Sequence, residues 1–172
     1  MLKVVEKISD MLAAAASFVS RIMVIFVATI LFVQVVLRYL FLYSLPWPEE
    51  ASRYVMIWAV MLGGSLLVKD EQLVSVDFFD KLWSPKLLVY RNIAFRVLLI
   101  LMLAVLFYYG LDQAMFARNR TTAALQISWF WPYLAIPVGA GLMLIQMVAL
   151  FLRDVIRGVP KDQGPTILRA EI

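Results

Sequence analysis

The sequence contains no cysteine and no histidine. Without cysteine, the chain has no disulfide, no thiol nucleophile and no thiolate metal ligand. Without histidine, it lacks the commonest metal ligand and the usual axial ligand of haem. These absences exclude a four-helix membrane cytochrome and a hydrolase with a Ser-His-Asp triad, and we expect no cofactor and no metal site.

Charge is also scarce. Only 16% of the 172 residues are charged and 63% are hydrophobic, whereas an ordinary soluble domain is about 25% charged and about half apolar. A chain of this length cannot bury so much apolar surface within itself, so the bilayer must serve as part of its solvent. The sequence therefore predicts an all-α integral membrane protein.

Four stretches almost free of charge predict four transmembrane helices, at about residues 11–40, 48–68, 92–111 and 131–152. The first contains Arg21, whose long side chain can extend to an interface. It is too long for a signal peptide and no cleavage motif follows it. We expect one four-helix transmembrane domain over residues 1–158, followed by a cytoplasmic tail over residues 159–172.

The distribution of lysine and arginine predicts the orientation. One side of the predicted membrane domain receives Lys3, Lys7, Lys69, Lys81, Lys86, Arg91, Arg153, Arg157, Lys161 and Arg169. The other side receives Arg38, Arg53, Arg118 and Arg120. Because cytoplasmic segments carry the excess of positive charge, both termini are expected in the cytoplasm. The same spread of cations along the chain argues against a nucleic-acid-binding patch.

The segment between the second and third spans, residues 72–83, has an amphipathic pattern. At helical spacing Val76 and Trp83 share a side, while Asp77 falls mostly on the other. This pattern predicts a short helix in the cytoplasmic membrane interface, beginning at Gln72. An ordinary connecting loop is the alternative.

The densest group of charged side chains lies where the first span ends and the second begins. Glu49 and Arg53 are four residues apart, in the favourable order for an ion pair, and Glu50 is three residues from the same arginine. Arg38 ends the first helix on the same side, and Trp47 precedes the acids. These residues predict an ion-pair network that anchors two helix ends, contacts a partner protein, or does both. Catalysis by the two carboxylates is disfavoured because no nucleophile or metal ligand accompanies them.

The loop before the fourth span is uncharged from residue 121 and rich in aromatic side chains. It is expected to settle on the membrane, with Trp129, Trp131 and Tyr133 forming an outer aromatic belt. Within the spans, glycines such as Gly63 and Gly139 are expected to let helices approach closely. No acidic or basic residue falls at the middle of a span, so the sequence predicts no ion path of its own.

The same residues resemble the small membrane subunit, the Q subunit, of the tripartite ATP-independent periplasmic (TRAP) transporters. The first group of matches is Arg38, Trp47, Glu49, Glu50, Arg53, Trp58, Leu62, Gly63, Val76 and Asp77. The second group, in the last loop and span, is Leu125, Ile127, Trp129, Tyr133, Pro137 and Gly139. One departure is Gln72, where the family often has a histidine, and a glutamine cannot titrate near neutral pH.

The resemblance implies a non-catalytic subunit of a secondary transporter in the bacterial inner membrane. In that family a periplasmic substrate-binding protein captures an organic acid, and a large multi-span subunit carries it inward with sodium ions. The small subunit is expected to support the large one and to help dock the binding protein, in contact with membrane lipids. C4-dicarboxylates, sialic acid and other organic acids all fit this sequence equally. The alternatives are an independent small channel or transporter, or a carboxylate-based membrane enzyme.

Overall fold

Four long helices account for the apolar stretches. The computed structural model describes residues 2–43, 45–70 and 85–157. Its helices are α1 (Leu2–Leu40), α2 (Trp47–Lys69), α3 (Pro85–Phe116) and α4 (Phe130–Arg157), and a short 3-10 helix, η2 (Ala117–Asn119), extends α3. Within them, four segments are long and apolar enough to span a membrane: Lys7–Leu40, Trp47–Lys69, Ile93–Asn119 and Phe130–Leu152. The predicted all-helical class with four spanning helices is confirmed.

Helix α1 is longer than the sequence pattern indicated, since it begins at Leu2 rather than near residue 11. Its 39 residues correspond to about 58 Å at 1.5 Å per residue, nearly twice the ~30 Å hydrocarbon core of a bilayer. The helix continues through charged residues at its start, which hydropathy alone does not register. One of them, Asp10, forms an ion pair with Lys69 at 2.9 Å. This contact joins the ends of α1 and α2 that lie opposite their connection.

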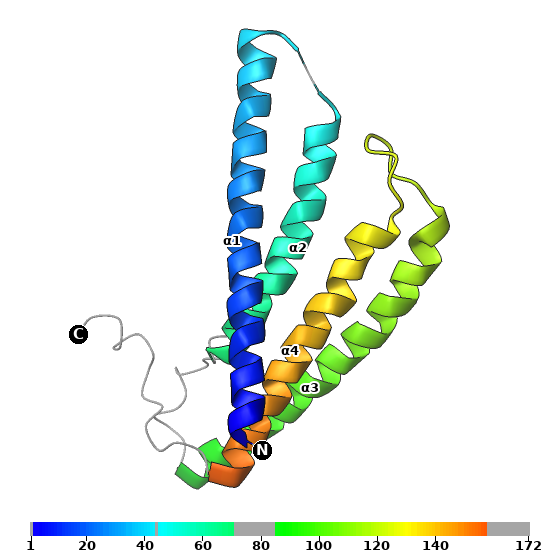
Figure 1. Cartoon of the computed structure of the whole chain (residues 1–172). Coiled ribbons are helices and arrows are strands. Elements are labelled where there is room, and N and C mark those ends of the chain that lie inside the picture. The colour runs from blue at the N-terminus through cyan, green and yellow to red at the C-terminus, as the bar shows by residue number, and fades with distance from the viewer. Residues whose placement is uncertain (1, 44, 71–84, 158–172) are drawn as a thin grey trace, which may run out of the picture.

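The helices form two hairpins that pack side by side (Figure 1). Helix α1 packs mainly on α2, α2 also packs on α4, and α3 packs on α4. The spatial order is therefore α1–α2–α4–α3. Figure 1 also shows that the hairpins diverge towards the end that carries the α1–α2 and α3–α4 connections.

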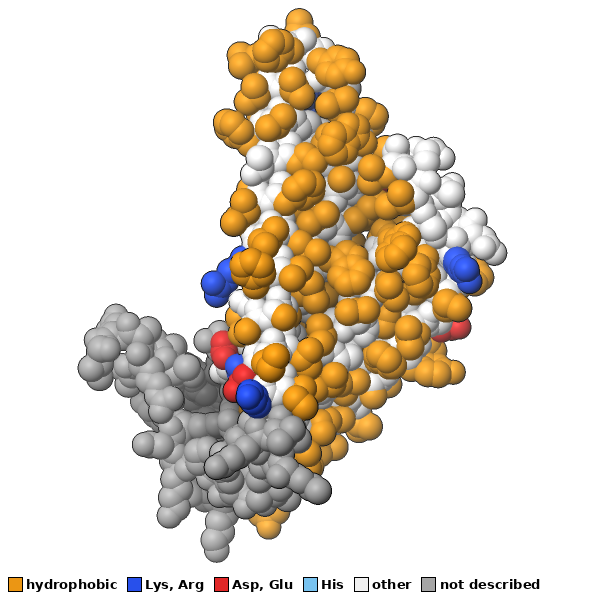
Figure 2. Space-filling model, viewed as in Figure 1, with side chains coloured by type: hydrophobic (Ala, Val, Ile, Leu, Met, Phe, Trp, Pro, Cys, Tyr) orange, Lys and Arg blue, Asp and Glu red, His pale blue; other side chains and the backbone are white. Residues whose placement is uncertain are grey.

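Most large apolar side chains lie on the outside of the molecule, and small side chains are frequent between the helices. Figure 2 shows apolar side chains over most of the visible face, with few charged groups among them. The buried positions include Ala13, Ala16, Ala59, Ser65, Ala135 and Ala140. Small residues at helix contacts are typical of membrane proteins, because hydrocarbon outside removes the hydrophobic drive to bury large side chains.

Two glycines of α2 and α4 lie where helices approach closely, as the sequence predicted. A Cβ atom on Gly139 of α4 would lie 2.6 Å from Met61 Cβ and 3.0 Å from the Met61 carbonyl oxygen of α2. On the other face of α2, a Cβ on Gly63 would lie 3.3 Å from the Ser20 hydroxyl oxygen. That hydroxyl donates a hydrogen bond to the carbonyl of Ala59 at 2.8 Å. Helix α2 is thus held closely between α1 and α4.

One buried polar side chain on α4 is at odds with its apolar surroundings. Gln146 is 1% exposed, and within the described part of the chain neither its amide nitrogen nor its amide oxygen has a hydrogen-bond partner. We expect Gln146→Leu to raise the free energy of unfolding by about 1–3 kcal/mol, because an unpaired buried polar group costs about that much. Thermal unfolding in detergent would measure the change.

Gln34 of α1 provides the control for that substitution. It is also buried, at 8% exposure, but its amide nitrogen donates to a Glu49 carboxylate oxygen at 3.3 Å and to the Leu45 carbonyl at 3.5 Å. Gln34→Leu should therefore lower stability. A lower melting temperature for both variants would mean that the Gln146 amide has a hydrogen-bond partner, such as a bound water molecule.

Two predictions lie outside the described residues. The interfacial helix with Gln72, Val76, Asp77 and Trp83 falls within residues 71–84, and the tail falls within residues 158–172. The cytoplasmic position of both termini and the division into domain and tail remain predictions from the sequence.

Candidate functional site

The candidate site begins at the start of α2. Trp47 and Pro48 occupy the first helical positions, after Pro46. Proline suits this position because its missing N–H would have no helical partner. Glu49 and Glu50 follow in the first turn, where a negative charge meets the positive end of the helix dipole. The sequence therefore places two carboxylates at a well-defined helix start.

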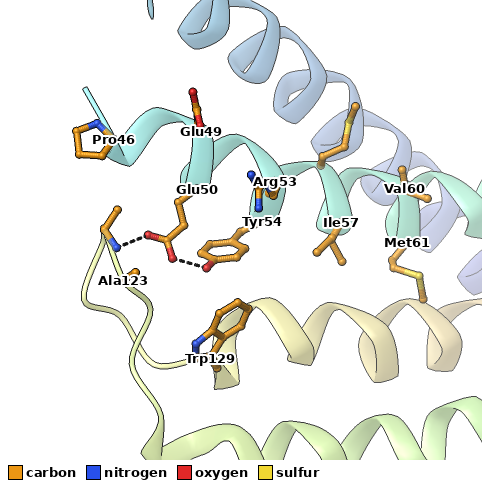
Figure 3. Close-up of a pocket in the computed structure, with 12 residues that line it drawn as sticks. Pro46, Glu49, Glu50, Arg53, Tyr54, Ile57, Val60, Met61, Ala123 and Trp129 are labelled. Atoms are coloured by element: carbon orange, nitrogen blue, oxygen red, sulfur yellow. Dashed lines mark hydrogen bonds between the residues drawn. The ribbon is translucent and has the colours of Figure 1, made fainter. Parts of the chain in front are cut away.

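Glu50 connects this helix start to the loop between α3 and α4. One carboxylate oxygen accepts a hydrogen bond from the Tyr54 hydroxyl at 2.5 Å. The other oxygen accepts from the backbone amides of Ala124 at 2.7 Å and Leu125 at 2.8 Å. Figure 3 shows Glu50 and Tyr54 on the side of α2 that faces this loop. The two hairpins are therefore joined through one side chain, across 74 and 75 residues of sequence.

The loop that binds Glu50 is a closed turn. Thr122 is 1% exposed; its backbone N–H donates to the Ile127 carbonyl at 2.8 Å, and its hydroxyl accepts from the Ile127 N–H at 3.2 Å. Gln126 has a φ of 55°, a left-handed conformation that lets the chain reverse within a few residues. The turn presents the backbone amides of residues 124 and 125 to α2. The sequence predicted a loop that lies on the membrane and did not predict this contact with α2.

The predicted aromatic residues lie next to this junction. The Trp129 ring is 5.5 Å from the Tyr54 ring and 5.8 Å from the Tyr133 ring, measured between centroids. Trp131 is exposed, and its carbonyl accepts a hydrogen bond from the Trp58 indole N–H of α2 at 3.1 Å. These contacts tie the start of α4 to α2. The interfacial aromatic belt of these side chains remains a prediction.

The charged groups are not connected as the sequence predicted. Among the described residues, neither Arg38 nor Arg53 forms an ion pair with a glutamate. Glu49 instead accepts the hydrogen bond from Gln34, and Glu50 is turned towards the loop. Both arginines are exposed, where an ion pair contributes little. The structure therefore brings Glu49, Glu50 and Arg53 to one helix end, held by hydrogen bonds to other partners, and leaves Arg38 apart on α1.

Sequence reasoning missed the residues that complete the junction. Tyr54 lies four residues after Glu50, so helical spacing could have signalled that contact. The turn around Thr122 gave no comparable signal, because its role depends on backbone amides rather than on side-chain chemistry.

Beside the junction is a groove of about 790 Å³. It is lined by Pro46, Glu49, Glu50, Arg53, Tyr54, Met56, Ile57, Val60, Met61, Ala123, Ala124 and Trp129. Figure 3 shows the groove between α2 and the start of α4. Its charged side chains come only from the first turns of α2, and the rest of its lining is mostly apolar. Within the described residues, no group of three or more acidic side chains is placed to hold a metal ion.

Four apolar helices, each long enough to span a membrane, define a multi-pass membrane component. Residues 27–157 match the family model described as the DctQ component of tripartite ATP-independent periplasmic transporters. The chain therefore belongs to this family of transport proteins, and it is a multi-pass protein of the inner membrane. The family resemblance drawn from the sequence is confirmed.

Two curated relatives extend the comparison. The chain is 28% identical over 119 residues to the sialic acid TRAP transporter permease protein SiaT of Haemophilus influenzae, covering 69% of this chain and 19% of the relative. It is 29% identical over 108 residues to the isethionate TRAP transporter permease protein DctMQ of Oleidesulfovibrio alaskensis, covering 59% and 16% respectively. The chain thus spans less than one fifth of the length of the relatives it matches.

Proposed function

We propose that this chain is the small, non-catalytic membrane subunit of a sodium-coupled importer of organic acids. It supports a separate large transport subunit and helps dock a periplasmic substrate-binding protein. The observation that carries the proposal is the coverage of the two permeases: the matched region is 19% of one and 16% of the other. Most of each permease therefore lies outside the part that this chain resembles, and that remainder is where we place the substrate path.

The interior of the described helices supports this division of labour. The buried polar side chains are Ser9, Gln34, Ser52, Ser65, Thr122 and Gln146. Several of them are engaged in local hydrogen bonds, such as that of Ser65 with the Leu62 carbonyl and that of Ser52 with the Glu49 carbonyl. A conducting path needs a continuous polar or charged lining. The described helices are therefore better suited to supporting a partner subunit than to forming a transport path.

We place the partner contact at the helix ends that carry Arg38, Trp47, Glu49, Glu50 and Arg53, with Trp47 as its anchor and the charged side chains at its border. Trp47 is 41% exposed although its neighbour Pro48 is buried. Exposed tryptophan and arginine side chains are over-represented among the residues that dominate protein interfaces. If both termini are cytoplasmic, the α1–α2 and α3–α4 connections lie on the periplasmic side, where residues 39–47 and 113–131 would meet the binding protein.

Co-expression with the large subunit of the same transporter tests the assembly. The tagged chain should retain the large subunit during purification. Trp47→Ala should lower the recovered large subunit by roughly tenfold or more, since interface hot spots cost about 2 kcal/mol or more. Tyr108→Ala, which removes another exposed aromatic side chain on α3, should leave recovery unchanged.

The proposal fails if the chain purifies without a large subunit and its deletion leaves uptake intact. It also fails if the purified chain alone transports the solute into liposomes, which is the behaviour of an independent channel or transporter. An enzyme would assemble normally as the Glu49→Gln variant, which keeps an acceptor oxygen for Gln34, and would lose only turnover.

A further inference from the structure

The groove beside α2 is amphipathic along its length. Two adjacent rows of α2 side chains line it: Glu49, Arg53, Met56 and Val60 in one row, and Glu50, Tyr54, Ile57 and Met61 in the other. Each row starts with charged or polar groups and continues with apolar ones. A molecule that fills the groove must therefore be polar at one end and apolar over the remainder.

The length of the groove corresponds to one leaflet of a bilayer. From Glu49 to Val60, α2 rises by about 17 Å at 1.5 Å per residue, compared with about 15 Å for half of the hydrocarbon core. The groove ends where Met61 meets Gly139 and closes the space between α2 and α4. Helix α2 itself continues to Lys69. A transmembrane helix of a partner would contact α2 over the full thickness of the bilayer. The groove spans only half of that thickness, so it fits a lipid of one leaflet better than a partner helix.

The apolar part of the groove is open to the surroundings. Met56 is 49% exposed, Ile57 39% and Val60 63%, while the Trp129 ring lies on the opposite side of the groove, next to the start of α4 (Figure 3). An acyl chain can enter such a groove sideways from the bilayer. It would cover apolar side chains that the four helices leave exposed.

The charges at the mouth select the head group. The Arg53 guanidinium is exposed and forms no ion pair among the described residues, and guanidinium groups bind phosphate through paired hydrogen bonds. Glu49 and Glu50 add negative charge beside it. These carboxylates repel a head group that is only anionic and attract one that also carries a cation.

We propose that this groove binds one zwitterionic phospholipid, with its phosphate at Arg53, its head-group ammonium towards Glu49 and an acyl chain along Met56, Ile57 and Val60. Phosphatidylethanolamine has this chemistry. The lipid occupies the leaflet next to the α1–α2 connection and wedges between α2 and the α4 start, outside the contacts of Glu50.

The test uses the complete chain in nanodiscs, with phosphatidylethanolamine that carries a photoreactive group in one acyl chain. The label should appear in the segment that contains Met56, Ile57 and Val60. Unlabelled phosphatidylethanolamine should compete for it, and phosphatidylglycerol should compete much less. Arg53→Ala should weaken binding by about tenfold, as expected for the loss of a charge-assisted hydrogen bond, whereas Arg118→Ala, an exposed arginine outside the groove, should have no effect.

A second variant, Ile57→Trp, fills the groove without changing its charges and should also remove the label. Equal competition by both lipids, or labelling that neither variant reduces, would identify ordinary boundary lipid and overturn the proposal. Loss of the label when the large subunit is present would show that a partner helix covers the groove, and would overturn it as well. The measurement on the chain alone does not depend on the proposed transport role.

Discussion

Glu50→Ala is expected to detach the loop between α3 and α4 from α2, with a lower melting temperature and a several-fold lower yield of the folded protein. The substitution leaves three donors without their acceptor: the Tyr54 hydroxyl and the backbone amides of Ala124 and Leu125. These hydrogen bonds are partly buried, so water can replace the lost acceptor only in part. Size-exclusion chromatography and thermal unfolding in detergent would measure the loss.

Two further variants separate the hydrogen bonds of Glu50 from its position. Glu50→Gln keeps one acceptor oxygen but places an NH₂ group against existing donors, so its loss should be intermediate. Glu49→Ala removes the acceptor of a single 3.3 Å bond from Gln34 and should be the mildest of the three. If Glu49→Ala and Glu50→Ala have equal effects, the three bonds of Glu50 do not hold the hairpins together.

The four helices were predictable because hydropathy acts locally. Each spanning helix satisfies its own backbone hydrogen bonds, and each must be apolar over the thickness of the bilayer. A run of residues without charge therefore specifies a span with little information from elsewhere in the chain. The same signal underestimated the length of α1. The first turns of this helix carry charged residues, which lower the local hydropathy although the helix continues through them.

The junction at Glu50 was only half predictable. Helix rules correctly placed two carboxylates in the first turn of α2, but they also favoured a local ion pair with Arg53, which does not form. The Glu50 carboxylate instead accepts hydrogen bonds from backbone amides 74 and 75 residues away in the sequence. Such a contact depends on the packing of the two hairpins, and charge-assisted bonds to amides outweigh an exposed ion pair.

Gly139→Ala is expected to lower the free energy of unfolding by about 1–3 kcal/mol, the usual cost of overpacking. Helix propensity alone predicts the opposite sign, because alanine is favoured over glycine by about 1 kcal/mol inside a helix. Packing should prevail since the added Cβ would lie 2.6 Å from Met61 Cβ and 3.0 Å from the Met61 carbonyl oxygen. Backbone and Cβ atoms cannot rotate away, so α2 and α4 must separate.

Neighbouring glycines distinguish this explanation from a general preference for small residues. A Cβ on Gly141 would lie 3.2 Å from Phe107 Cε2, and an aromatic ring can shift by a few tenths of an ångström. Gly141→Ala should therefore be neutral or slightly stabilising in the same unfolding measurement. Similar losses for Gly139→Ala and Gly141→Ala would contradict a role for the Met61 contact. The expected difference instead assigns to one glycine the close approach of α2 and α4, which also closes the inner end of the groove.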